Sequence, residues 1–414
     1  MTKEELETKK ESLYLRNFIA FCIEGFTFSG AMSIFSPDSI LPAYISNLTS
    51  SPFALSLLIA VEYGLAYGSY IFACSIGLRA KSPKWTSVSI CFLQRIGYFF
   101  IFLSTYSTAD PSKALVLFFV AYAFYALSGG LSNPLYQQMV SVSIFKNVSS
   151  FFGVYEIFGA AGGLVGSILF QTLVKRFEFP LSYRYTFLFG LILSLIATAV
   201  VAIGVKEVID DRKTEKISTK QVLGIGKDIL KTNKDYRNFV LIRIIMAVGE
   251  LSVPYYIGTI ISKPGAPANY EGTLAIVYLV AKMLGTYIEG KLGDKYSFYA
   301  IMKICCISGI IASAIAIVSN NWIICTVMYC FVAFAQGGSW IVNSVANIEF
   351  SRGSNYITIY SAMLGLSLAP IYIVSSLCGA AIANALSIKA MFVITLVAYL
   401  SALIMISRKG RVNE

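Results

Sequence analysis

Seven ionisable residues stand inside long apolar stretches of this chain. They are four acids and three bases: Glu24, Glu62, Arg95, Glu156, Arg243, Glu250 and Lys282. A lone charge at the centre of a bilayer costs about 3 kcal/mol on insertion scales. Seven such charges facing lipid would cost about 20 kcal/mol, which exceeds the typical stability of a folded protein. We therefore expect these side chains to face a polar interior, a water-filled cavity or one another.

Buried carboxyl groups of this kind could carry protons. Desolvation favours the protonated acid, whereas a nearby arginine or ammonium group favours the carboxylate. A buried glutamate can therefore take up a proton and exchange its basic partner for a solute. Glu24 and Glu62 are the favoured candidates, because the first two apolar stretches hold both near mid-depth without an adjacent base in sequence. For each residue the alternative is an interhelical bond that only holds the structure together.

Helical spacing gathers further polar groups on shared faces. Gln336, Trp340, Asn343 and Asn347 follow i, i+4, i+7 and i+11, so one helix face would be polar and aromatic. Three other stretches show the same kind of pattern: Tyr125, Ser128, Ser132 and Tyr136; Tyr278, Lys282 and Glu289; and Arg243, Glu250 and Pro254, where the proline predicts a kink. A moderately polar ligand needs such stripes, and they add Gln336, Trp340 and Asn343 to the candidate binding residues.

Several chemistries are excluded by what the chain lacks. It contains no histidine, which removes His-based acid–base catalysis, Ser-His-Asp triads and HExxH zinc sites. Its eight cysteines form no CxxC pair, and no GxxxxGK[ST] phosphate loop occurs. We expect neither an enzyme, nor a metal site, nor a cofactor.

The elements that must position these residues are membrane helices. Hydrophobic residues make up 57% of the chain and charged residues only 13%, about half the share in soluble domains. A span needs roughly 20 apolar residues, and about twelve such runs occur. They lie near 16–36, 53–76, 86–105, 114–138, 150–174, 185–205, 238–262, 272–290, 298–318, 322–346, 355–383 and 388–407. The expected fold is an all-α, polytopic membrane protein.

The runs fall into two sets of six that echo each other. Gly68-Ser69-Tyr70-Ile71 in the second run matches Gly285-Thr286-Tyr287-Ile288 in the eighth, and Gly129-Gly130 matches Gly337-Gly338. This predicts two pseudo-symmetric six-helix bundles, 1–205 and 238–414, with the solute path between them. The intervening stretch 206–237 is a predicted linker, in which 217–230 is either an amphipathic membrane-surface helix or a solvated segment.

The basic residues indicate orientation rather than nucleic-acid binding. The net charge is +11, and most lysines and arginines fall in alternate connections between the apolar runs. By the positive-inside rule, both termini and the linker are cytoplasmic. We expect a multi-pass protein of the plasma membrane, embedded in lipid as a monomer.

One connection carries a recognisable motif. Gly290-Lys291-Leu292-Gly293-Asp294-Lys295, after the eighth run, resembles the loop motif G-x-L-[AG]-D-[RK] of the major facilitator superfamily. In that family the motif latches one conformation through neighbouring helix ends, so the resemblance implies a gating role for Gly290, Asp294 and Lys295. The first half departs from it, because Gly77 stands where the aspartate is expected. A latch in that half would depend on Arg79, Lys81 or other groups.

Two more family motifs are incomplete. The fourth-run motif R-x-x-x-G reads Tyr125-x-x-x-Gly129 here, and the fifth-run antiporter motif lacks its proline. Arg95 is a candidate substitute for the missing arginine. Proton antiport therefore does not follow from the motifs.

The resemblance and the buried charges together imply secondary active transport of a small solute by alternating access. The expected coupling ion is the proton, and export of amphipathic compounds or metabolites is the first hypothesis. An uptake symporter for a nutrient is the alternative. A third class is a lipid translocase or membrane sensor built on a transporter fold.

Overall fold

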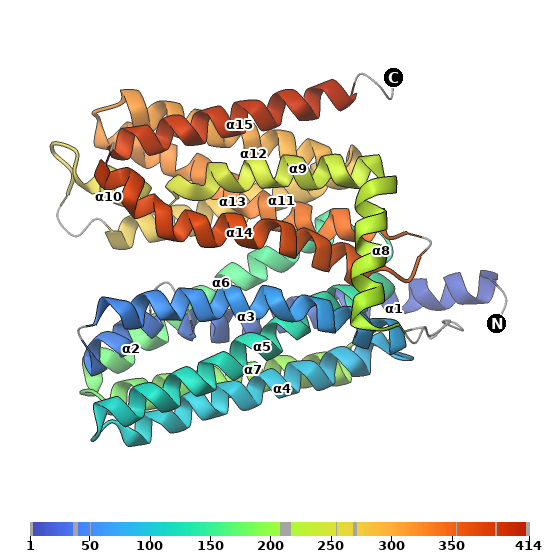
Figure 1. The fold of residues 1–414 in the computed structure, drawn as a ribbon, viewed down its shortest axis with the longest axis horizontal. Coiled ribbons are helices and arrows are strands. Elements are labelled where there is room, and N and C mark those ends of the chain that lie inside the picture. Colours follow the sequence, from blue (N-terminus) through green and yellow to red (C-terminus); the bar gives the residue numbers. More distant parts are fainter. Residues whose placement is uncertain are drawn as a thin grey trace. The chain divides into compact units, whose positions relative to one another are not determined.

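The computed structural model describes residues 3–35, 40–49, 51–207, 217–253, 255–267, 271–352, 354–385 and 387–410. Every element in these ranges is a helix (Figure 1). The middle of the predicted linker, 208–216, and the predicted kink at Pro254 lie outside the described residues.

The helices of the first half of the sequence follow the predicted runs closely. They are α1 (Lys3–Ile34), α2 (Ile40–Leu48), α3 (Pro52–Arg79), α4 (Pro83–Ser104), η1 (Thr105–Ser107), α5 (Pro111–Ser143), α6 (Val148–Arg176) and α7 (Leu181–Gly204). The linker contributes α8 (Thr219–Thr232).

The second half repeats the pattern with one interruption. Its helices are α9 (Lys234–Gly249), η2 (Glu250–Ser252), α10 (Tyr255–Ile261), α11 (Glu271–Lys295), α12 (Phe298–Val318), α13 (Trp322–Phe350), α14 (Ile357–Ala385) and α15 (Ile388–Gly410). The seventh predicted run therefore divides into α9, η2 and α10. The division places Glu250 at the end of regular α-helix.

Ten helical segments in the described residues are long and apolar enough to cross a membrane. Helices α3, of 28 residues, and α11, of 25 residues, also have spanning length. The all-α, multi-pass architecture expected from the sequence is confirmed, and about twelve spans remain consistent with it.

Local sequence explains where several helices begin. Ser82 and Asp110 each precede a proline, and their side chains accept hydrogen bonds from the backbone N–H of Trp85 and Lys113. Proline suits the first helical position because its missing N–H would be unpaired there anyway. The N-cap side chains satisfy the next free donors, so both starts are encoded locally.

The chain divides into two compact units that do not follow the sequence halves strictly. One contains 1–146, 158–226 and 351–363, and the other contains 147–157, 227–350 and 364–414. The first turns of α6 belong to the second unit and the rest of α6 to the first. For α14 the assignment is reversed: its first turns belong to the first unit and its remainder to the second. The boundaries predicted at 205 and 238 stay a prediction.

Glycines of the two matching pairs, one from each pair, pack equivalent helices within each unit. A Cβ at Gly130 on α5 would meet the carbonyl oxygen of Ala66 and the hydroxyl of Ser69 on α3. A Cβ at Gly337 on α13 would meet the Thr286 side chain on α11 at 2.6 Å. Ser69 and Thr286 occupy matching positions of the repeated tetrapeptide, so the echo in sequence corresponds to the same helix crossing in both units.

The linker helix α8 is amphipathic. Val222 and Gly226 are buried, whereas Lys220, Lys227 and Lys231 are exposed. A Cβ at Gly226 would meet the Met363 side chain, so this face packs on protein. The start of the linker is tied down by Glu207, which accepts hydrogen bonds from the Ser82 hydroxyl and, at 2.9 Å, from the Lys84 N–H.

Candidate functional site

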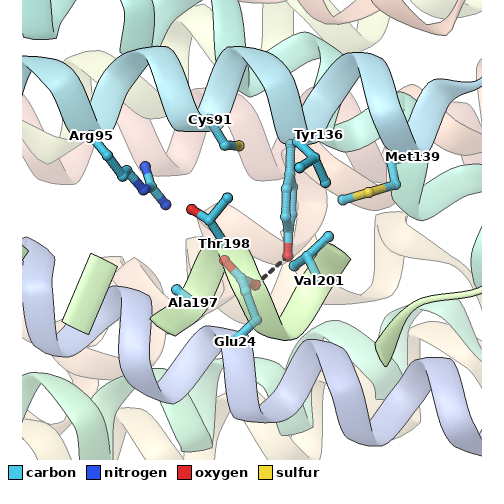
Figure 2. A pocket seen from close by; sticks show the side chains of 9 residues that line it. Glu24, Cys91, Arg95, Tyr136, Met139, Ala197, Thr198 and Val201 are labelled. Carbon is cyan, nitrogen blue, oxygen red and sulfur yellow. Dashed lines mark hydrogen bonds between the residues drawn. The ribbon is translucent and has the colours of Figure 1, made fainter. Parts of the chain in front are cut away.

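Glu24 lies beside a small cavity inside the first unit. The cavity has a volume of about 10 Å³, room for about one water molecule. Figure 2 shows Glu24 of α1 facing Tyr136, whose hydroxyl donates a hydrogen bond to Glu24 Oε2 at 2.6 Å. Thr198 of α7 and Arg95 of α4 also line the cavity. The predicted acid and a predicted base therefore line the same small cavity, together with apolar side chains such as Met139 and Val201.

Arg95 is buried and held by several neighbours. Its Nε donates to the carbonyl oxygen of Ser194 at 3.1 Å, and its Nη1 donates to Gln94 Oε1 at 2.6 Å. The guanidinium also lies 5.0 Å from the Phe28 ring centroid, a cation–π arrangement that suits a desolvated arginine. The positive charge beside the cavity is therefore fixed in place before any solute arrives.

Glu62 occupies a second tyrosine-rich position in the same unit. The Tyr122 hydroxyl donates to Glu62 Oε2 at 2.5 Å. The Tyr122 ring packs on Tyr125, and the Tyr125 ring packs on Tyr98, with centroids 5.5 and 4.9 Å apart. Tyr125 stands where the family motif has arginine, so an aromatic stack replaces the charge there.

In the second unit, Arg243 and Glu250 form an ion pair. Arg243 Nη1 lies 3.5 Å from Glu250 Oε1, and Arg243 Nε donates to Asn343 Oδ1 at 2.8 Å. Glu250 also accepts from the hydroxyls of Ser339 and Tyr372, each at 3.0 Å. Arg243 is completely buried, and the break after α9 places its partner Glu250 at the helix end.

Lys282 and Glu156 form the second pair in this unit. Lys282 Nζ lies 3.0 Å from Glu156 Oε2, and both side chains keep partial exposure, 27% and 14%. The pair joins α11 to the first turns of α6. It is thus more open to solvent than the Arg243–Glu250 pair, a property expected of charges that exchange partners.

The predicted stripe on α13 is only partly used. Asn343 binds Arg243, as above. Gln336 has its Nε2 buried without a hydrogen-bond partner among the described residues. Trp340 is 43% exposed and stays a prediction. All seven ionisable residues keep the status of candidates, and their pairing is what the structure adds.

The loop motif at the end of α11 contacts the start of α6. Asp294 Oδ1 and Oδ2 accept hydrogen bonds from the backbone N–H groups of Ser149 and Ser150, each at 2.9 Å. A carboxylate at a helix N-terminus satisfies free donors and interacts favourably with the helix dipole. A Cβ at Gly290 would lie 2.7 Å from the Ser149 carbonyl oxygen, so glycine permits the close crossing. Lys295 is exposed.

The first half makes its matching contact without an acid. Gln138 Nε2 donates to the Gly77 carbonyl oxygen at 3.1 Å, and Cys74 Sγ donates to the Thr358 carbonyl oxygen at 3.2 Å. A Cβ at Gly77 would lie 2.8 Å from the Thr358 methyl group. Arg79, one of the groups on which a latch in this half would depend, donates to the carbonyl oxygen of Ile217 in the linker, just before α8, at 3.3 Å.

Sequence reasoning missed several partners of these carboxyl groups. Tyr122, Ser339 and Tyr372 donate to predicted acids, but hydroxyl residues are common in membrane helices and carry no distinguishing pattern. Tyr136 stands in a polar stripe with Tyr125, Ser128 and Ser132 at helical spacing, and that stripe was the available signal for it. Among the described residues, no group of three or more Asp, Glu, Cys or His side chains could hold a metal ion.

Comparison with known proteins gives a consistent result. A sequence model of the Major Facilitator Superfamily matches residues 18–347. A search of curated proteins found no match. Among solved structures, the transporter FucP in its outward conformation is similar, with a TM-score of 0.73 at 14% identity over 94% of this chain and 97% of that one.

Two further structures show the same likeness. The proton:xylose symporter XylE has a TM-score of 0.69 at 13% identity, over 96% of both chains. The human organic anion transporter MFSD10 has a TM-score of 0.71 at 9% identity, over 95% of this chain and 99% of that one. At such low identity these likenesses describe the fold.

Proposed function

Because the chain belongs to the Major Facilitator Superfamily, we propose that this membrane transporter couples movement of a small solute to protons by alternating access. The protein is a multi-pass secondary transporter and not an enzyme. The coupling ion, the solute class and the direction form the proposal. In it, the two halves, 1–205 and 238–414, rock about a central site and are joined by the linker 206–237.

The observation that carries the proton coupling is the Glu24–Tyr136 bond beside the cavity that Arg95 also lines. A phenolic hydroxyl can donate to a carboxyl group in either protonation state, so Glu24 keeps this partner when it gains or loses a proton. Arg95 lines the same cavity, and its guanidinium is held there by Ser194 and Gln94. A site of this composition can release a proton when the cavity opens and regain it when the cavity closes.

The solute class follows from the remaining candidates. The second unit contains two acid–base pairs, and the first unit contains two acids that accept hydrogen bonds from tyrosines. This composition suits an amphipathic or zwitterionic solute. We propose export of such compounds across the plasma membrane, with both termini in the cytoplasm and the protein working as a monomer. Uptake of a nutrient by symport is the second candidate, since the structurally similar FucP is a fucose:proton symporter and XylE is a proton:xylose symporter.

The test is solute-dependent proton flux in liposomes that contain the purified protein and an internal pH dye. The probes are a panel of sugars, amino acids, organic anions and organic cations, added on either side. The wild type should move protons with at least one probe, and the sign of the pH change distinguishes symport from antiport. Glu24→Gln should abolish proton flux yet retain solute exchange at zero gradient, because the amide keeps the shape but not the charge.

The matched control is Glu11→Gln, which alters an exposed residue paired with Lys146 and should leave flux unchanged. Unchanged flux in both Glu24→Gln and Glu62→Gln would remove these residues from the coupling role. A wild type that moves no soluble probe but scrambles labelled lipid would instead identify a lipid translocase.

A further inference from the structure

Glu289 is a buried acid that neither ion pair uses. It lies on α11, is fully buried, and occupies the helix between Lys282 and Asp294. Its Oε2 has no hydrogen-bond partner among the described residues. Its Oε1 has only a long contact, 3.9 Å, with the Cys305 thiol of α12.

The space for this carboxyl group is made by a glycine. A Cβ at Gly338 on α13 would lie 2.7 Å from Glu289 Oε1. The same Cβ would also meet Cys305 Sγ, so any side chain larger than hydrogen at Gly338 would displace the thiol and the acid. Gly338 therefore makes room for a carboxyl group. The matching glycine of the first half, Gly130, lies instead against atoms of α3.

Among the described residues, two titratable side chains act on Glu289. Lys282 lies two turns earlier on the same helix, and Cys305 lies on α12. From α13 it meets Gly338, which carries no charge. Lys282 is already bound to Glu156 of α6 at 3.0 Å. A carboxylate buried without donors or a counter-ion is strongly unfavourable and takes up a proton instead.

We propose that Glu289 is a proton-binding carboxyl group that controls the contact between α11 and the first turns of α6. When protonated it is neutral and leaves Lys282 to Glu156. When it loses its proton, the new carboxylate competes for Lys282, and the Lys282–Glu156 pair weakens. The same first turns of α6 also hold Ser149 and Ser150, whose N–H groups bind Asp294, so one proton acts on the gating contact.

This inference deepens the proposed proton coupling and rests on it. It adds a coupling site in the second unit to Glu24 in the first. It also gives the motif aspartate a neighbour on the same helix through which a proton could act.

The first experiment is infrared spectroscopy of the full-length protein in lipid, without any solute. At neutral pH, the wild type should show a C=O band of a protonated carboxylic acid that is missing from Glu289→Gln. Glu11→Gln, which changes an exposed and ionised acid, should retain the band. A wild-type spectrum identical in this region to that of Glu289→Gln would overturn the proposal.

The second experiment is hydrogen–deuterium exchange of the peptide that covers 148–157. At alkaline pH the wild type should exchange at least about fivefold faster than Glu289→Gln, the range of a typical coupling free energy. At neutral pH the two should agree. Equal rates at both pH values would overturn the control of the α11–α6 contact.

A labelling experiment covers the case in which the variant does not fold, and the flux assay separates this proposal from the proposed function. If Glu289→Gln does not fold, labelling of the wild type by dicyclohexylcarbodiimide, an apolar reagent for protonated carboxyl groups, should modify Glu289 at neutral pH, and absence of that adduct overturns the proposal. Wild-type liposomes without solute-dependent proton flux, combined with the band and the exchange difference, would reject the proposed transport coupling while leaving the Glu289 site in place.

Discussion

Two helix contacts in matching places of the two halves solve one packing problem differently. Where α11 ends on the start of α6, Asp294 binds two backbone N–H groups and Gly290 lies against backbone atoms. Where α3 ends on the start of α14, Gly77 lies against side-chain atoms of Thr358 and Gln138, and a thiol donates to a carbonyl oxygen. The first contact contains a charged carboxylate, and the second contains only uncharged groups.

The difference teaches which contact can respond to charge. A carboxylate on a helix N-terminus depends on its own ionisation and on nearby charges. Thiol and amide hydrogen bonds do not change over the physiological pH range. We therefore expect the α11–α6 contact to be the regulated one and the α3–α14 contact to be a constant one.

The largest effect should come from Gly290→Ala. The added Cβ would meet the Ser149 carbonyl oxygen at 2.7 Å and Ser150 Cα at 3.1 Å, and backbone atoms cannot move aside cheaply. Thermal unfolding in detergent should show a loss of about 1–3 kcal/mol, together with reduced transport. The matched variant Gly77→Ala meets movable side-chain atoms and should lose less than about 1 kcal/mol. Equal losses would remove the distinction between the two contacts.

Asp294→Ala should rank second. It removes the acceptor for two N–H groups at the start of α6 and should cost about 1–2 kcal/mol, the range for losing an N-cap side chain. The control Lys295→Ala changes the exposed neighbour and should stay within about 0.5 kcal/mol. The measurements are the unfolding midpoint and the transport rate. A Lys295→Ala variant as damaged as Asp294→Ala would argue against the cap as the source of stability.

The smallest effect is expected from Cys74→Ser in the uncharged contact. Serine keeps a donor for the Thr358 carbonyl oxygen, so one hydrogen bond replaces another and the net change should be about 1 kcal/mol or less. Transport should keep its wild-type pH dependence. A shifted pH profile in this variant would show that the α3–α14 contact also responds to protons.

Most of the architecture could be predicted from the sequence because lipid imposes strict rules. A backbone in hydrocarbon must satisfy its own hydrogen bonds, so each long apolar run became a helix near its predicted bounds. The exception is informative. The seventh run is interrupted at Glu250, where an acid bound by Arg243, Ser339 and Tyr372 ends the α-helix.

The sequence could name candidate residues of the site, but it could not show how they are arranged. Burial cost alone selected the seven charged residues, and the motif selected Asp294. The sequence could not show that Lys282 pairs with Glu156, because the two residues lie 126 positions apart. The sequence placed Glu289 on a helix face with Lys282 but did not select it as a candidate, because the lack of a partner for a carboxyl group is a property of the surrounding helices.

The sequence by itself determined that this chain crosses a membrane repeatedly and that its buried charges require polar surroundings. These conclusions follow from transfer free energies, which depend on residue type and spacing alone. Only the tertiary structure decided which acid meets a base, which meets a tyrosine and which meets neither. Such pairings depend on distances of about 3 Å between helices, and those distances are set by how the helices pack.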